Sequence, residues 1–131
     1  MKFLAEANKL TVTLEGAEIF FALKRKLVVP RAQIVDLQWL PESTLGGRLW
    51  RIGGADIPRM LWAGRFVGNG KRYFLYLRRP QGLPWKRGAL QLQNTLTITL
   101  QDNFYHQVLL TCEPDIGASL MNWFKHIPPA S

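Results

Sequence analysis

The sequence predicts a mainly β domain that ends in one α-helix. Apolar residues alternate with polar residues in several short runs, and a period of two is typical of strands. Gly, Pro, Asn and Asp separate these runs. After position 114 the apolar residues recur at helical spacing instead. With 131 residues the chain has the length of one domain, so we expect a single core over residues 1–131.

The first expected hairpin begins near residue 9. Residues 10–14 alternate between Leu or Val and Thr, and residues 15–18 read Glu-Gly-Ala-Glu, a tight turn. A second apolar run covers residues 19–29. We expect it to end at Pro30, because proline has no N–H for the hydrogen-bond ladder. Residues 33–40 are predicted to form a third strand.

The middle of the chain combines two loops with a second hairpin. Between Pro41 and Pro58 two Gly-Gly pairs interrupt any period, which predicts a long loop of the kind that often carries function. Residues 60–67 and 71–79 are predicted strands, and the Asn-Gly pair within residues 68–70 is a strong signal for the turn between them. Residues 80–88 form another expected loop.

The last third predicts strands and then the helix. Residues 89–92 and 95–100 are extended, residues 101–103 turn the chain, and residues 105–111 return it. The helix is expected at about 114–127, with a proline at its first position, where the missing N–H costs nothing. Its apolar stripe consists of Ile116, Leu120, Trp123, Phe124 and Ile127. In total, about seven strands between residues 9 and 111 precede one helix.

Seven antiparallel strands followed by one terminal helix is also the element order of pleckstrin-homology (PH) domains. Residues 10–18, 23–34 and 64–74 resemble a group of small bacterial PH-like proteins. The resemblance implies a seven-stranded antiparallel, partly open barrel capped by the C-terminal helix, and a binding module, but no site residues. PH domains that recognise phosphoinositides use basic residues around the first hairpin loop. Residues 15–18 hold two acids and no base, so we do not expect that lipid site here.

The positive charge lies in one part of the chain. The net charge is +8, and residues 24–87 hold 14 basic and three acidic residues, a balance of +11, whereas the remainder carries −3. This asymmetry suits an anionic partner. The alternative is that folding spreads the charges over the surface.

The composition also bounds the compartment. Cys112 is the single cysteine, so no intrachain disulfide can form, and a reducing, cytoplasmic location is expected. Residues 1–9 do not read as a secretion signal. No run of 18 apolar residues occurs, so we expect no transmembrane segment.

The candidate partner surface combines arginine and lysine with tryptophan in the two predicted loops and the second hairpin, because arginine and tryptophan dominate binding hot spots. It consists of Arg48, Trp50, Arg51, Arg59, Lys71, Arg72, Trp85, Lys86 and Arg87. Basic residues also bracket Tyr73, Phe74 and Tyr76, a pattern that suits base stacking on single-stranded nucleic acid. Strand alternation disfavours that interpretation, because it places at least one set of these aromatic residues in the core.

Catalytic chemistry is poorly represented. His106 and Cys112 are separated by six strand residues, roughly 20 Å, too far for a nucleophile and its base. Two histidines and one cysteine give no metal-ligand spacing, and no glycine-rich phosphate loop occurs. We therefore expect no enzyme and no cofactor.

Three functions stay open at this point. The first is a PH-like module that binds a protein partner, or a second copy of itself, through the basic, Trp-bearing loops. The alternative is peripheral binding to an anionic membrane surface through the same basic segment. Binding of single-stranded nucleic acid or of a small molecule in a pocket is the lesser alternative, and a filled interior would argue against the pocket.

Overall fold

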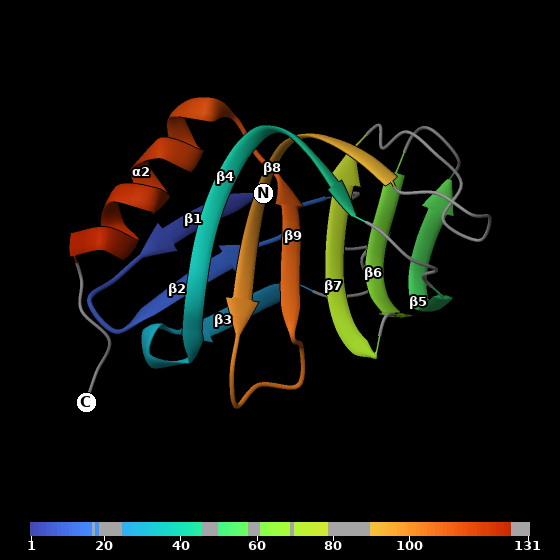
Figure 1. Cartoon of the computed structure of the whole chain (residues 1–131), viewed down its shortest axis with the longest axis horizontal. Helices are drawn as coiled ribbons and strands as arrows, with labels where there is room; N and C mark the ends of the chain where they lie inside the picture. Colours follow the sequence, from blue (N-terminus) through green and yellow to red (C-terminus); the bar gives the residue numbers. More distant parts are fainter. Residues whose placement is uncertain are drawn as a thin grey trace.

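The computed structural model describes residues 1–16, 18, 25–45, 50–57, 61–68, 70–78 and 90–126. Of Trp50, Arg51, residues 54–57 and Leu90 it describes the backbone only. Within these ranges nine strands form two sheets, and one α-helix follows them (Figure 1). The prediction of a mainly β chain with a C-terminal helix is confirmed. The two sheets are not closed into a barrel, and the strands number nine instead of seven.

The smaller sheet holds the first three strands in the order β1-β2-β3. These are β1 (Lys2–Ala5), β2 (Lys9–Thr13) and β3 (Lys26–Pro30), and both pairs are antiparallel. The pairing of β2 with β3 confirms the first predicted hairpin, although residues 19–24 lie outside the described ranges. β1 was not predicted, because four residues are too few for a period of two to stand out.

The larger sheet holds six strands in the order β4-β8-β9-β7-β6-β5. Their bounds are β4 Ile34–Leu45, β5 Trp50–Ile57, β6 Leu61–Gly68, β7 Lys71–Arg78, β8 Leu90–Leu100 and β9 Gln107–Thr111. The β8–β9 hairpin lies between β4 and β7, which places β9 parallel to β7. The prediction of an entirely antiparallel arrangement was therefore wrong at this one pair.

β4 runs past Pro41, where its strand was expected to end. Its pairing with β8 passes from Leu40 and Thr95 to Glu42 and Gln93 without a pair at the proline. β4 is an edge strand, in which every second N–H faces away from the neighbouring strand and makes no ladder bond. The proline is therefore compatible with a twelve-residue strand.

The prediction of a long loop between Pro41 and Pro58 was also wrong at every described residue, and residues 41–45 continue β4. β5 occupies residues 50–57 and forms the other edge of the large sheet. Its register shifts between Arg51 and Gly53, and Gly54 lies opposite Gly64 of β6. Glycines in a strand often mark such a bulge or a close approach of two backbones, so the Gly-Gly pair was misread as a loop signal. Residues 46–49 and 58 lie outside the described ranges.

The second predicted hairpin is confirmed by the pairing of β6 with β7. Its turn ends at Gly70, whose φ of +71° is a conformation that favours glycine. β7 is buried on both faces. Phe74 and Tyr76 point into one core cluster with the small sheet, whereas Tyr73, Leu75 and Leu77 belong to a second cluster on the other side.

The small sheet packs behind β4, β8 and β9, and the main core lies between them (Figure 1). α2 (Pro114–His126) lies at the open side of these two layers and confirms the predicted helix. Asp115 in its first turn and Lys125 in its last complement the helix dipole. Leu120 is buried, and Trp123 and Phe124 pack against the core as the sequence suggested.

α2 is also tied to the sheets by polar contacts. The Nε1 of Trp39 on β4 donates to the Cys112 carbonyl just before the helix, at 3.1 Å. Arg31, in the 3-10 helix η1 (Arg31–Gln33), donates to the Phe124 carbonyl at 3.2 Å, and its guanidinium lies 4.2 Å from the Phe124 ring centre. The Trp123 indole N–H donates to the Glu6 carbonyl at 2.8 Å. These contacts fix the helix beside the end of β1.

Candidate binding surfaces

The structure describes the side chains of only two residues of the predicted partner surface, Lys71 and Arg72. Trp50 and Arg51 lie in β5 and not in a loop, and their side chains are not described. The other members, Arg48, Arg59, Trp85, Lys86 and Arg87, lie outside the described residues. The structure therefore leaves the grouping of these nine residues into one surface as a prediction.

Arg72 is held in place at the start of β7. Its Nε donates to the Phe104 carbonyl, and its guanidinium lies 4.7 Å from the centre of the Phe104 ring. Its backbone N–H donates to Nδ1 of His106 at 3.0 Å. Lys71 beside it is exposed. Arg72 and Phe104 thus hold a cation and an aromatic ring in a fixed arrangement, which is a common composition of binding hot spots.

Phe104 was missed by the sequence analysis, although 56% of its surface is exposed. Its loop, residues 101–106, is bound to η1: Asn103 donates to the Gln33 side chain at 2.8 Å, and that side chain donates to the Asp102 carbonyl at 2.9 Å. An ordered loop that presents an aromatic ring to solvent is a candidate contact surface. The available signal was an aromatic residue directly after the polar turn Gln101-Asp102-Asn103.

The aromatic residues of β7 do not offer a stacking platform. Tyr73, Phe74 and Tyr76 are at most 4% exposed. Base stacking needs an accessible ring face, so these three rings contribute nothing to a nucleic-acid surface in this structure.

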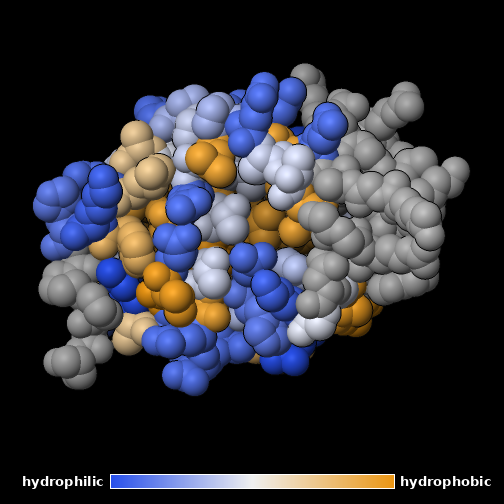
Figure 2. All heavy atoms as spheres, in the orientation of Figure 1, coloured by the Kyte–Doolittle hydropathy of each residue, from blue (hydrophilic) through white to orange (hydrophobic). Residues whose placement is uncertain are grey.

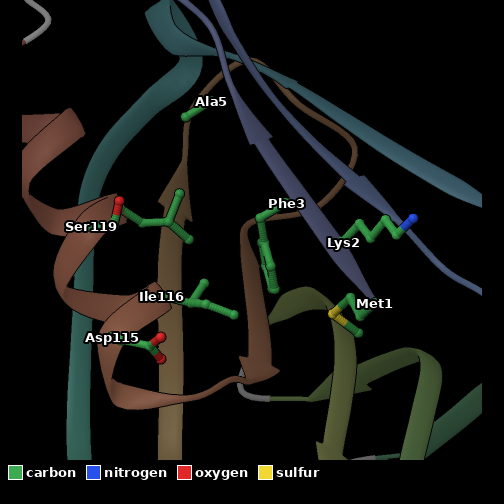
Figure 3. A pocket seen from close by; sticks show the side chains of 8 residues that line it. Met1, Lys2, Phe3, Ala5, Asp115, Ile116 and Ser119 are labelled. Carbon is green, nitrogen blue, oxygen red and sulfur yellow. The ribbon is translucent and has the colours of Figure 1, made fainter.

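A groove of about 680 Å³ lies between β1 and α2 (Figure 3). Its lining is Met1, Lys2, Phe3, Ala5, Asp115, Ile116, Ser119 and Leu120. Phe3 and Ile116 point towards each other from the two walls, while Lys2 points away from the groove. The groove is open to solvent, and polar and apolar atoms line it in nearly equal parts.

The β1 wall of this groove is a sheet edge. Leu4 pairs with Thr11, and the N–H of Glu6 donates to the Lys9 carbonyl at 2.8 Å. In an antiparallel pair hydrogen-bonded positions alternate, so the even-numbered residues of β1 face β2. The N–H and C=O groups of Phe3 and Ala5 therefore point away from β2, along the free edge. The groove thus combines apolar side chains such as Phe3 and Ile116 with main-chain donors and acceptors that have no hydrogen-bond partner among the described residues.

A second hollow, of about 450 Å³, lies over β4 and β8 around Ser43 and Leu92. Ser43 Oγ is a buried atom without a hydrogen-bond partner among the described residues. Its lining holds one charged side chain, Glu42, so it offers no cluster of charges that would select a ligand. On the face that Figure 2 shows, the described hydrophobic residues reach the surface only in small, separate areas.

The titratable groups of the described residues do not converge on a reactive centre. Burial raises the pKa of the Cys112 thiol to about 11, with Asp115 adding to the effect. His126 Nδ1 lies 2.8 Å from the Asn122 carbonyl in the last turn of α2. Within the described ranges no group of three His, Cys, Asp or Glu side chains is placed to hold a metal ion, and no helix is long and apolar enough to cross a membrane.

The two glutamates of the first predicted turn, Glu15 and Glu18, lie in different environments. Glu15 remains partly exposed, whereas Glu18 is buried and lies 2.6 Å from the N-terminal ammonium and 3.1 Å from the Arg78 guanidinium. Burial opposes the charged form of Glu18, but the hydrogen bonds from the ammonium and from the Glu15 N–H outweigh it and hold its pKa below the usual value. Glu18 is a structural anion and not part of a solvent-facing loop.

Comparison with known proteins gives no relative: no family model, no curated protein and no solved structure matches the chain. The functional argument therefore depends on the geometry of the chain itself.

Proposed function

We propose that the chain is a non-catalytic, PH-like binding module that captures a protein partner as an extended segment along β1. One observation carries the proposal: the free main-chain groups of Phe3 and Ala5 line a groove whose other wall is α2. An extended segment that adds to a sheet edge gains main-chain hydrogen bonds, and pockets for its alternate side chains give specificity. Phe3 and Ile116 supply the apolar contact for such side chains.

The groove sets a limit on the segment. β1 has four residues, and the bond from Trp123 to the Glu6 carbonyl closes the groove at that end. A partner strand can therefore pair over about four residues, roughly 13 Å. Its side chains at alternate positions would face Phe3 and Leu120, which favours apolar residues there.

The remaining elements of the proposal have separate support. The C-terminal helix packed on a β core and the resemblance of residues 10–18 and 64–74 support the PH-like assignment. The buried, protonated thiol of Cys112 supports a non-catalytic role. A single cysteine supports a cytoplasmic location.

A proline substitution tests the edge directly. Ala5→Pro removes an N–H that points to the free edge, so it deletes a donor to the partner without breaking the bond ladder to β2. Ser119→Trp fills the groove from an exposed position of α2. Phage-displayed random peptides of about seven residues, roughly 23 Å when extended, would be selected on the immobilised chain. We expect the selected peptides to lose at least about tenfold in affinity on both variants, while Lys125→Ala, at an exposed position of α2 that does not line the groove, binds as wild type.

Two outcomes would contradict the edge assignment. One is the absence of any enriched peptide, and the other is equal binding to wild type and Ala5→Pro when both have the same circular dichroism. Self-association is tested on the same variants: a dimer in sedimentation velocity that Ala5→Pro dissociates would make a second copy of the chain the partner.

The surface around Lys71 and Arg72 is the second candidate for the partner, and the ordered pair of Arg72 and Phe104 favours it. Peptides that bind Ala5→Pro as they bind wild type, but do not bind Phe104→Ser, would assign partner binding to this surface. Peptides that bind both variants as tightly as they bind wild type would exclude both surfaces.

A further inference from the structure

The outward face of the small sheet carries cations around two exposed aliphatic side chains. Side chains alternate along a strand, and Leu10, Val12, Leu27 and Val29 point into the core. Their neighbours therefore point outward. One outward row across the three strands is Leu4, Thr11 and Val28, the next is Lys2, Thr13 and Lys26, and Lys9 begins the row on the other side.

The central row is apolar and exposed. Leu4 is 58% exposed and Val28 is 43% exposed, whereas Thr11, which lies between them on β2, is only 6% exposed. Neither aliphatic residue belongs to a core cluster. The two therefore form a small, raised apolar strip on a flat sheet.

The flanking charges have one sign. Lys2 and Lys26 stand on either side of Thr13, about 10 Å apart across two strand spacings. The nearest acids already face cations: Glu6 lies 3.9 Å from the Lys9 ammonium, and Glu15 lies 3.8 Å from the N-terminal ammonium. The face therefore keeps a positive surplus around its apolar strip.

The kind of cation indicates the kind of anion. The three cations in these rows, Lys2, Lys9 and Lys26, are all lysines, which act as hydrated point charges, whereas arginine is the residue of choice for bidentate recognition of one phosphate or carboxylate. The described cavities lie elsewhere, at β1–α2 and at β4–β8. A flat face with lysines around aliphatic residues suits an extended anionic surface into whose boundary apolar groups can sink.

We propose that this face of the β1–β2–β3 sheet binds the surface of an anionic membrane, with Leu4 and Val28 at the lipid boundary and Lys2, Lys9 and Lys26 at the headgroups. This inference is independent of the groove, which lies on the free edge of β1. It also differs from the expectation that the basic segment 24–87 as a whole binds lipid, because Lys2 and Lys9 lie outside that segment.

The test is co-sedimentation of the full chain with phosphatidylcholine vesicles, with and without about a third of phosphatidylserine, at low and near-physiological salt. Wild type is expected to bind only the anionic vesicles and to bind them less at the higher salt. Lys26→Glu should lower the binding at least about fivefold. Lys125→Glu makes the same change of charge on the exposed end of α2 and should bind nearly as wild type.

A matched pair tests the apolar strip. Val28→Ser and Leu40→Ser remove aliphatic side chains that are each 43% exposed, but only Val28 lies on the proposed face. We expect Val28→Ser to weaken binding to the anionic vesicles at both salt concentrations and Leu40→Ser to leave it unchanged. Neither position is buried, so both variants should remain folded, which circular dichroism checks.

Several results would overturn the proposal. Wild type that does not bind anionic vesicles at low salt contradicts it, and so does an equal loss for Lys26→Glu and Lys125→Glu, which would indicate net charge alone. A loss confined to Lys71→Glu would move the contact to the start of β7. Binding to soluble polyglutamate in the absence of vesicle binding would make the face a site for an acidic protein. None of these variants alters the groove, so failure here leaves the peptide proposal standing.

Discussion

The indole ring of Trp39 lies directly against the Cα of Gly117. A Cβ at position 117 would overlap the Trp39 ring, with Cγ as its nearest atom. The same ring donates its N–H to the Cys112 carbonyl, and the Trp39 backbone N–H is directed at the Met121 sulfur at 3.3 Å. Trp39 therefore joins β4 to α2, and its position is fixed by the bond from its indole N–H to Cys112 and by the contact of its backbone N–H with Met121.

Gly117→Ala should destabilise the protein. Alanine usually stabilises a helix relative to glycine by about 1 kcal/mol, but here the added methyl would displace the Trp39 ring. Overpacking of this kind costs about 1–3 kcal/mol. We expect a net loss in the free energy of unfolding, measured by urea denaturation. Ser119→Ala, at an exposed position of the same helix, is the control and should not lower stability. An increase in stability for Gly117→Ala would show that the ring moves freely.

The contrast between Gly70 and Gly53 shows how far the sequence alone reaches. At residues 68–70 the Asn-Gly signal and the alternation on both sides agreed, so the β6–β7 hairpin could be predicted. At Gly53 and Gly54 the local signal was that of a loop, but cross-strand pairing to β6 decides the conformation. That pairing joins neighbouring strands of one hairpin, but a glycine pair does not by itself show that a partner strand follows. The parallel contact of β7 with β9 is different, because it joins residues far apart in the sequence, such as Tyr73 and Gln107.

The candidate sites were harder to predict for the same reason. Phe104 and Arg72 are 32 residues apart and meet only because β9 lies beside β7. Leu4 and Val28 share a face because both pair with Thr11, Leu4 from β1 and Val28 from β3. Counting charges along the chain identified residues 24–87 as a basic segment, but it could not place Lys2 beside Lys26. Composition indicated a basic binding protein, whereas only the order of the strands indicates which basic residues lie together.

Glu18 should stabilise the fold at neutral pH and lose this effect in acid. Its folded pKa is lowered, so its contribution is complete above the unfolded value of about 4.3 and is lost as the pH falls through the folded pKa. Glu18→Gln should cost about 1–3 kcal/mol at pH 7, as for hydrogen bonds to charged groups. Urea denaturation at pH 7 and near pH 3 measures this.

The control for Glu18 is Glu42→Gln, an exposed carboxylate on β4, which should change stability little at either pH. The cost of Glu18→Gln should shrink as the pH falls towards the lowered folded pKa of Glu18, because the wild-type carboxyl then begins to take up a proton. A cost that is equal at both pH values would mean that the ion pairs with the ammonium and Arg78 contribute nothing.

The Cys112 thiol should be unreactive in the folded protein. Burial raises its pKa to about 11, so at pH 8 only about a thousandth is thiolate, the reactive form. We expect a chromogenic disulfide reagent to label the native chain far more slowly than the chain in urea, which serves as the control because Cys112 is the single cysteine. Native labelling as fast as in urea would contradict the buried position.

Arg31 should contribute more to stability than an exposed arginine. It is 5% exposed, donates to the Ile34 and Phe124 carbonyls and lies over the Phe124 ring. Arg31→Met keeps the apolar stem but removes these donors, and two buried carbonyls then lose a partner. We expect a loss of about 1–3 kcal/mol in the free energy of unfolding. Arg65→Met, at an exposed position of β6, should cost much less.

Because Arg31 fixes the C-terminal end of α2, hydrogen exchange at Trp123 and Phe124 should rise in Arg31→Met before global unfolding. Unchanged exchange there, together with unchanged stability, would show that apolar packing alone holds the helix against the core.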